Sequence, residues 1–417
     1  MQSVREFGRT TFSSLSVRNF RIYAIGQGIS LSGTWMQTIA QGLLVLKLTG
    51  SGTALGLVVA LQTLPVLLFG AWGGVVADRF PKRSILYVTQ SVACGLALAL
   101  GILVAIGNVH IWTVYAIAFA LGMVNAIDNP TRQSFVLEMV GRSQLANAVS
   151  LNSTEINLAR VIGPTIAGVL VATVGLAACF LINAASYIAV IYSLSKMRED
   201  ELQPSPRLVG SKGQLSAGLA YVRKTPLVLS TLIMMAIIGT FTYEFTVILP
   251  LFSKFTFGNE AAGYAGLSAC MGFGAVIGGI YTASRLQSGP NALFVAAALF
   301  GASVLVVSIM PTLLYAMLGM ILVGFFSIAF SAIGNVTVQM NSAVEMRGRI
   351  MALWTVAFLG STPIGGPIIG GIGEHIGPRW GLAVGGFAAI GAAMLGAWIL
   401  KNENLRLTGG ETVTASR

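Results

Sequence analysis

Charged side chains are scarce in this sequence of 417 residues. Asp, Glu, Lys and Arg together make up 9% of the chain, whereas a typical soluble protein carries roughly 25%. A soluble protein needs charge to wet its surface, but 55% of this chain is apolar and its mean hydropathy is +0.80. The composition therefore excludes a soluble globular protein and indicates that lipid surrounds most of the chain.

Reactive side chains are scarce as well. Cys94, Cys179 and Cys270 each stand alone in an apolar segment, which favours small packing residues over a disulfide or a metal site. The sequence contains no Walker phosphate loop and no Ser/His/Asp constellation. We therefore expect no enzyme activity, no metal and no cofactor. The energy for any work should come from an ion or solute gradient, and we expect a proton gradient.

Long apolar runs are what the sequence has in abundance. A helix needs roughly 20 apolar residues to cross about 30 Å of hydrocarbon. Runs of this kind predict twelve transmembrane helices, near residues 20–46, 54–77, 85–107, 111–134, 150–172, 177–195, 226–252, 261–283, 291–309, 312–338, 347–371 and 379–400. A polar stretch separates the sixth run from the seventh. We expect a six-helix bundle at 1–195, a cytoplasmic linker at 196–225, a second six-helix bundle at 226–402 and a polar cytoplasmic tail at 403–417.

The two halves of the sequence resemble each other. Three short patterns recur about two hundred residues apart and in the same order. They are Gly73–Arg79 with Gly278–Arg285, Gly141-Arg142 with Gly348-Arg349, and Gly163–Gly168 with Gly366–Gly371. The repeats predict an all-α membrane protein of two pseudo-symmetric six-helix bundles, an arrangement in which transporters bind substrate between the halves near the midplane.

Lys and Arg are distributed unevenly over the loops. With the N-terminus inside, the cytoplasmic segments hold Arg5, Arg9, Arg18, Arg79, Lys82, Arg83, Arg142, Lys196, Arg198, Arg207, Lys212, Arg223, Lys224, Arg285, Arg347, Arg349, Lys401, Arg406 and Arg417. The opposite loops hold only Lys47, Lys254 and Arg379. This asymmetry predicts that both termini face the cytoplasm. Because the net charge of +11 lies in these loops, we expect no nucleic-acid partner.

Several motifs resemble those of one transporter family. Residues Gly74–Arg83, which read GVVADRFPKR, resemble the loop signature between the second and third helices of the major facilitator superfamily, with Pro81 where glycine is usual. The Gly163-Pro164 element resembles the antiporter motif of that superfamily's exporters. Residues 128–133 and 145–153 resemble the subfamily that includes the enterobactin exporter and related efflux proteins. The resemblance implies the major facilitator fold, alternating access and transport out of the cell.

Charged residues near the cytoplasmic edge form a candidate gate. At 1.5 Å per residue, Asp128 lies roughly 25 Å into the fourth helix, beside the loop that holds Asp78 and Lys82. In the family pattern, such residues latch the cytoplasmic side in the outward-facing state. Arg132 lies one turn beyond Asp128 and could pair with it, although Pro130 should disturb the helix between them. The expected gate consists of Asp78, Arg79, Lys82, Arg83, Asp128 and Arg132.

Polar side chains form stripes on the first, fourth, seventh and tenth predicted helices, whereas the twelfth carries none between Gly381 and Leu400. A polar stripe should face a water-filled cavity or another helix rather than lipid. The resemblance favours the cavity, because the superfamily's cavity is lined by those four helices. Helix–helix hydrogen bonding without a solute is the alternative. The candidate cavity residues are Gln27, Ser30, Thr34, Gln37, Gln41, Asn125, Thr240, Glu244, Ser331, Asn335 and Gln339.

Glu244 is the first candidate for a proton carrier. It is a carboxylate well inside the seventh predicted helix, with no basic residue within two helical turns. Carboxylates removed from water in this way can load and release a proton near neutral pH. The alternative is a structural glutamate bonded to Thr240 or to another helix. Asp128 and Glu155 are the further candidates for proton coupling.

The Gly-Pro pairs are candidate hinges. Gly163-Pro164 and Gly366-Pro367 each remove a helical hydrogen bond and permit a kink or tight packing. In a rocking transporter we expect them where the halves meet. A pure packing role is the alternative.

We therefore expect a proton-coupled exporter of small organic compounds, such as a drug, a siderophore or another metabolite, in the bacterial inner membrane. The expected partners are a small-molecule substrate and membrane lipid, and we expect a monomer. A symporter, an importer or a lipid-moving facilitator of the same fold remains an alternative. A membrane sensor that has lost transport is a further alternative, but it should carry an added signalling domain, and only a short tail follows Asn402.

Overall fold

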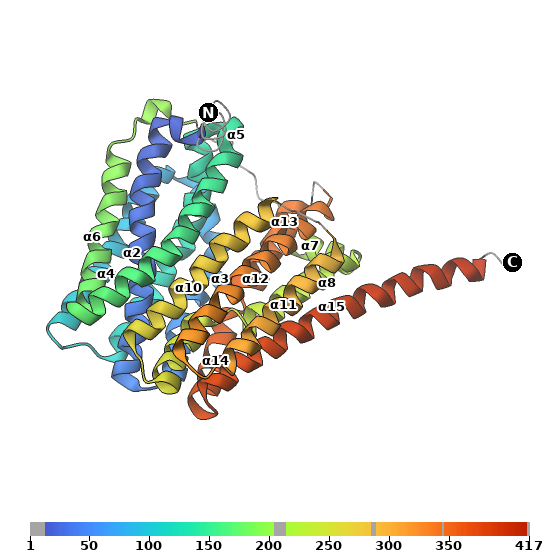
Figure 1. Cartoon of the computed structure of the whole chain (residues 1–417). Helices are drawn as coiled ribbons and strands as arrows, with labels where there is room; N and C mark the ends of the chain where they lie inside the picture. Colours follow the sequence, from blue (N-terminus) through green and yellow to red (C-terminus); the bar gives the residue numbers. More distant parts are fainter. Residues whose placement is uncertain (1–12, 204–213, 285–288, 344–345, 415–417) are drawn as a thin grey trace, which may run out of the picture. The chain divides into compact units, whose positions relative to one another are not determined.

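The computed structural model describes residues 13–203, 214–284, 289–343 and 346–414. Within these ranges all regular structure is helical (Figure 1). The elements are η1 (Ser13–Ser16), α2 (Arg18–Thr49), α3 (Gly52–Arg79), α4 (Lys82–Ala105), α5 (Ile111–Thr173), α6 (Leu176–Ser195), η2 (Glu199–Glu201), α7 (Gln214–Arg223), α8 (Pro226–Phe241), α9 (Phe245–Leu251), η3 (Phe252–Thr256), α10 (Ala261–Ser284), α11 (Pro290–Ser308), α12 (Leu313–Met340), α13 (Arg347–Leu359), α14 (Thr362–His375) and α15 (Pro378–Thr414).

The predicted twelve spans agree with these helices. Ten helical segments of the described chain are long and apolar enough to cross a membrane. One of them, α5, contains two predicted spans. The 32-residue α2 is not among the ten, because the polar stripe of the first predicted span lowers its hydropathy. With α5 counted as two spans and α2 added, the ten become twelve.

Some predicted boundaries need correction. The fourth and fifth spans are not separated by an extended loop, since α5 consists of two helices that meet at a kink at Gly141, where φ is 67° and ψ is 177°. Pro130 does not break this helix. The predicted linker contains η2 and α7, and the predicted tail is helical as far as Thr414. Of the basic residues used for orientation, six lie outside the described residues: Arg5, Arg9, Arg207, Lys212, Arg285 and Arg417.

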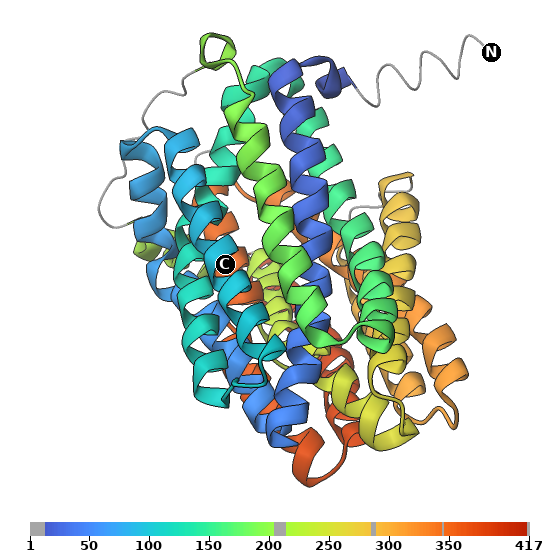
Figure 2. The ribbon, with the colours of Figure 1, turned by 90° about the vertical axis from the view of Figure 1, so that its left-hand side faces the viewer.

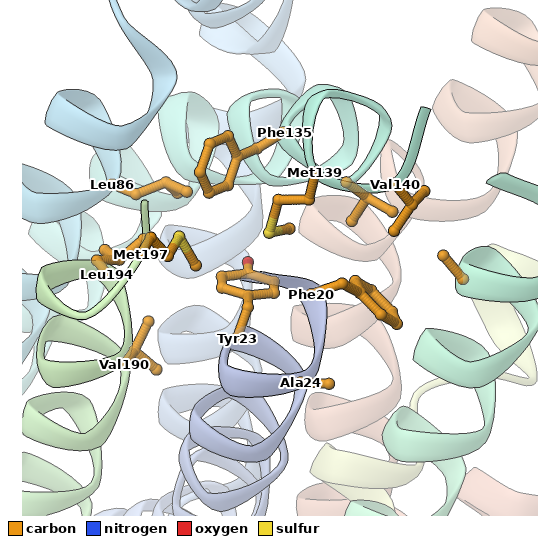
Figure 3. Packing of buried hydrophobic residues seen from close by; sticks show 12 residues of the cluster. Phe20, Tyr23, Ala24, Leu86, Phe135, Met139, Val140, Val190, Leu194 and Met197 are labelled. Carbon is orange, nitrogen blue, oxygen red and sulfur yellow. The ribbon is translucent and has the colours of Figure 1, made fainter. Parts of the chain in front are cut away.

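A buried cluster explains why the fourth span continues as a helix as far as Val140. Phe135 and Met139 of α5 are buried against Tyr23 of α2, and the Tyr23 and Phe135 rings meet edge to face at 6.0 Å (Figure 3). Leu86 of α4 and Leu194 of α6 complete the same cluster. Residues 135–140 therefore bury an apolar helical face inside the protein instead of ending at the membrane surface.

The chain divides into two compact units. The first contains Met1–Val209 with Asn259–Ala269, and the second contains Gly210–Gly258 with Cys270–Arg417. The change from one unit to the other at Val209 falls in the predicted linker. The predicted domain boundaries themselves stay a prediction, because the short segment Asn259–Ala269 is grouped with the first unit.

Equivalent glycines place equivalent helices in contact within each unit. A Cβ atom on Gly73 of α3 would lie 2.0 Å from the carbonyl oxygen of Ala126 on α5. A Cβ atom on Gly278 of α10 would lie 2.5 Å from the carbonyl oxygen of Phe325 on α12. Both glycines begin the first repeated sequence pattern. Because glycine has no side chain, the backbones of α3 and α5, and of α10 and α12, can come into direct contact, as is common between membrane helices.

In the second unit, two predicted spans are interrupted. The seventh was expected as one helix, but it divides into α8, α9 and the π-helical turn η3. The eleventh divides into α13 and α14 around Gly360 and Ser361. Interrupted helices expose backbone polar groups, which within a membrane are tolerated only where other groups satisfy them or where a cavity is lined. The first interruption contains Glu244.

Candidate functional site

The interruption between α8 and α9 is held in place by side chains. The Thr242 hydroxyl donates a hydrogen bond to the Gly385 carbonyl of α15 at 2.7 Å. The Tyr243 hydroxyl donates to the Ser327 carbonyl of α12 at 2.8 Å. Glu244, at φ −80° and ψ 36°, then starts α9, because its carbonyl accepts from the amides of residues 247 and 248. These hydrogen bonds stabilise the break and fix the position of Glu244 within the second unit.

The Glu244 carboxyl group is buried and incompletely bonded. The residue is 1% exposed, and its Oε1 has no hydrogen-bond partner among the described residues. The hydroxyl of Thr362 on α14 is its hydrogen-bonding neighbour. Of the two structural alternatives, the bond to Thr240 is not found, since the Thr240 hydroxyl donates to the Ala236 carbonyl at 2.7 Å, whereas the bond to another helix is present as the contact with Thr362. A buried carboxyl with a spare oxygen can take up a proton at that oxygen without losing an existing hydrogen bond.

Gly365 lets α14 approach this carboxyl. A Cβ atom at Gly365 would lie 1.9 Å from the Thr240 carbonyl oxygen and 3.0 Å from Oε1 of Glu244. Any side chain here would push α14 away from the end of α8. The contact explains why a glycine stands one residue before the Gly366-Pro367 pair.

We expect Gly365→Val to lower stability by at least about 2 kcal/mol, because overpacking against a backbone carbonyl forces helices apart. The measurement is the thermal unfolding midpoint of the purified protein in detergent. Gly391→Val in α15 is the matched control, since a Cβ atom there meets no atom within 4 Å. Equal midpoints for the two variants would show that the contact between α8 and α14 is not tight.

In the first unit, Asp128 is the centre of a buried polar cluster. It is 1% exposed and forms the predicted ion pair with Arg132. It also accepts hydrogen bonds from the Thr89 hydroxyl at 2.6 Å and from Nε2 of Gln90 at 2.9 Å. Sequence reasoning missed these two residues of α4, although an adjacent Thr-Gln pair in an apolar run was a usable signal. The cluster joins α4 to α5.

The loop residues of the predicted gate do not join this cluster. Lys82 forms its ion pair with Glu138 of α5 at 2.6 Å, rather than approaching Asp128. Arg83 pairs with Glu199 of η2 and donates from Nε to the Leu194 carbonyl at 2.9 Å. Glu138 is available to Lys82 because α5 continues past the predicted end of the fourth span and brings Glu138 to the start of α4. A common gate of Asp128 with the loop residues stays a prediction.

Asp78 and Arg79, the remaining members of the predicted gate, are exposed and form no ion pair within the described part of the chain. Their position at the end of α3 leaves them available to other partners. Their role in a gate stays a prediction.

Two glutamines in the polar stripe of α2 form hydrogen bonds with neighbouring helices. Gln37 accepts from Nδ2 of Asn183 on α6 at 2.7 Å, and Gln41 accepts from Nε2 of Gln62 on α3 at 3.1 Å. Both glutamines are at most 6% exposed. For these two residues the helix–helix alternative replaces the predicted cavity role. Gln27 differs, because its buried Oε1 has no partner among the described residues.

The other candidate cavity residues vary in exposure. Ser30 is buried, and the Thr34 hydroxyl donates to the Ser30 carbonyl at 2.9 Å. On α12 and α5, Ser331, Asn335 and Asn125 are half-buried. Gln339 is exposed and donates to Oδ1 of Asn335 at 2.5 Å. The half-buried amides remain open to solutes and stay candidate cavity residues.

The Gly-Pro pairs lie inside regular helix. A Cβ atom at Gly163 would lie 2.7 Å from the Ser32 carbonyl oxygen of α2, so this glycine packs α5 against α2 within the first unit. Pro164 and the pair Gly366-Pro367 lie within α5 and α14. The breaks in the second unit occur elsewhere, at residues 242–244 and 360–361. The packing alternative therefore accounts for Gly163, and the hinge role stays a prediction.

Comparison with known proteins agrees with this arrangement. The sequence model of the major facilitator family described as "Transmembrane secretion effector" matches residues 9–413. The chain belongs to this family. It is accordingly a multi-pass secondary transporter and not an enzyme.

Curated relatives extend over most of the chain. The staphyloferrin A transporter of Staphylococcus aureus is 23% identical over 385 residues, which cover 90% of this chain and 94% of the relative. The enterobactin exporter EntS of Citrobacter koseri is 23% identical and covers 90% of each chain. The multidrug efflux pump Tap of Mycolicibacterium fortuitum is 25% identical over 82% of this chain and 87% of its own length. This family of relatives transports small organic compounds, and two of the three are named for export.

Solved structures share the fold. A peptide-conjugate complex of a POT family transporter superposes with a TM-score of 0.74 and 11% identity, covering 91% of this chain and 95% of that one. An inward-facing, occupied bacterial homologue of the lysosomal transporter Spinster gives 0.71 and 14%, covering 92% and 97%. The twelve-helix major facilitator fold predicted from the sequence is thereby confirmed.

Proposed function

We propose that this transporter exports small organic compounds from the cytoplasm in exchange for protons. The observation that carries the proton part is the carboxyl group of Glu244, which is 1% exposed, has an unbonded oxygen and lies at a break in the seventh span. Protonation makes the carboxyl group neutral, and a neutral group is less costly to bury than a charged one. The protein can therefore change the side of the membrane to which the group is accessible more easily when the group is protonated. The proton gradient is then the energy source, and no cofactor is required.

The substrate class rests on the relatives. Proteins named as an enterobactin exporter, a staphyloferrin A transporter and a multidrug efflux pump each align with 82% to 90% of this chain. We therefore propose a siderophore, drug or similar metabolite as substrate. Half-buried Asn125 in the first unit and half-buried Ser331 and Asn335 in the second are the proposed substrate-contacting residues of each unit.

The remaining parts of the proposal follow from alternating access. The protein would act as a monomer in the bacterial inner membrane, with both termini in the cytoplasm. The ion pairs of Lys82 and Arg83, together with exposed Asp78 and Arg79, would open and close the cytoplasmic side. The Gly-Pro helices would carry the rocking motion.

The test is transport in everted membrane vesicles with an imposed inside-acid pH gradient. We expect uptake of enterobactin, staphyloferrin A or ethidium into vesicles that contain the protein, and none into vesicles without it. Nigericin, which collapses the pH gradient, should stop this uptake. Uptake that persists after nigericin would refute proton coupling, and higher accumulation in intact cells that express the protein would refute export.

A further inference from the structure

An apolar groove lies on the first unit between α2, α5 and α6. The ribbons of these three helices lie side by side in Figure 2. It has a volume of about 650 Å³, in the range typical of sites for drug-sized ligands. Exposed isoleucine and leucine side chains and several small residues line it. The lining includes Ile25, Ile29, Leu158, Ile162, Gly28 and Ala159.

Glu155 of α5 is the one ionisable residue in the lining. It is half-buried, and within the described residues its carboxyl forms no hydrogen bond and no ion pair. The two hydroxyl groups in the groove already donate hydrogen bonds to backbone carbonyls. Ser32 donates to the Gly28 carbonyl at 2.9 Å and Ser186 donates to the Asn183 carbonyl at 2.7 Å. Glu155 is therefore the polar group in the groove that still lacks a partner.

The carboxyl group lies toward one end of the groove. Helix α2 and the second part of α5 run in the same direction, because Ser14, just before α2, donates to Asn147 of α5, and Gly163 further along α5 contacts α2 at Ser32 and Met36. Glu155, eight residues before Gly163, is therefore level with Ala24 to Gly28 of α2, while Ile166 and Met36 line the other end. At 1.5 Å per residue, the apolar stretch beyond Glu155 extends roughly 16 Å along α5.

We infer that this groove binds an apolar organic cation, with the positive charge at Glu155 and the apolar body along Leu158, Ile162 and Ile166. Charge complementarity decides the sign, since the single charged group of the site is a carboxylate. With the predicted orientation, the Glu155 end faces the cytoplasmic leaflet, which is where an amphipathic cation would hold its charged group. The volume suits one drug-sized molecule better than a two-chain phospholipid.

The biological role of this site rests on the proposed export function. Binding to the site, however, is tested without a proton gradient. The probes are tetraphenylphosphonium and tetraphenylborate, which have the same shape and opposite charge. Binding to the purified full-length protein in phosphatidylcholine nanodiscs is measured by equilibrium dialysis, with empty nanodiscs subtracted. We expect tetraphenylphosphonium to bind the protein and tetraphenylborate to bind at least about tenfold more weakly, because the Glu155 carboxylate attracts a cation and repels an anion in a site partly shielded from water.

Two variants test whether the cation binds in the groove or elsewhere on the protein. Glu155→Gln should weaken tetraphenylphosphonium at least about tenfold and remove the preference for the cation. Gly28→Leu should fill the groove without a clash, since a Cβ atom there meets no atom within 4 Å, and should abolish binding. Gly95→Leu on α4, which is equally open, is the control and should bind like the wild type.

Equal binding of the two probes, or unchanged tetraphenylphosphonium binding in both Glu155→Gln and Gly28→Leu, would overturn the site. Loss of binding on adding phosphatidylethanolamine would assign the groove to lipid and also overturn it. Nigericin-sensitive transport together with failed cation binding would leave the export function intact and reject this site alone.

Discussion

Glu244→Gln is expected to abolish transport driven by a pH gradient. Glutamine is close to glutamate in size and keeps one acceptor oxygen, so it should occupy the space beside Thr362 and Gly365 without disturbing the break between α8 and α9. It cannot bind or release a proton at neutral pH. Uptake of the transported compound into energised everted vesicles should therefore fall to the level of vesicles without the protein.

A second measurement distinguishes lost coupling from lost transport. In counterflow, unlabelled substrate inside a proteoliposome exchanges for labelled substrate outside without any proton gradient. Glu244→Gln should retain this exchange, since the substrate site and the moving helices are unchanged. The control is Glu260→Gln, which changes an exposed glutamate next to α10 and should leave both activities at wild-type level. Full gradient-driven uptake by Glu244→Gln would remove this residue from the proton pathway.

Asp128→Asn is expected to destabilise the first unit by about 3 kcal/mol, because removing one partner of a buried ion pair leaves the other charge uncompensated. The Arg132 side chain is only 23% exposed, so water can replace the lost carboxylate only in part. The asparagine NH₂ group would also face the Thr89 hydroxyl or Nε2 of Gln90, which now donate to Asp128. The measurement is the free energy of unfolding by denaturant in detergent micelles.

The exposed Asp78 provides the matched control for this prediction. Asp78→Asn should change stability by less than about 0.5 kcal/mol, as is usual for surface substitutions. The double variant Asp128→Asn with Arg132→Gln should recover part of the loss, since it removes the unpaired charge. A single variant as stable as the wild type, or a double variant less stable than the single one, would contradict this account of the pair.

Composition and local sequence patterns were sufficient to predict the class of protein and much of its local structure. Apolar runs of membrane-spanning length fix the number of spans, because hydrocarbon tolerates few unsatisfied or charged groups. The pairing of Asp128 with Arg132 was predictable, since residues four apart lie on one face of a helix. The isolation of Glu244 from basic residues along its own helix was also visible. In each case the information lies within one turn or one span of the chain.

Contacts between helices were decided by the tertiary structure. Lys82 meets Glu138, and Gln37 meets Asn183, across sequence separations of 56 and 146 residues. Nothing in either local pattern specifies which face of a second helix will lie opposite. The break at Glu244 depends likewise on hydrogen bonds to α12 and α15, and Glu155 acquires an apolar groove only because α2, α5 and α6 pack around it. Periodicity shows which face of a helix is polar, whereas packing determines what that face contacts.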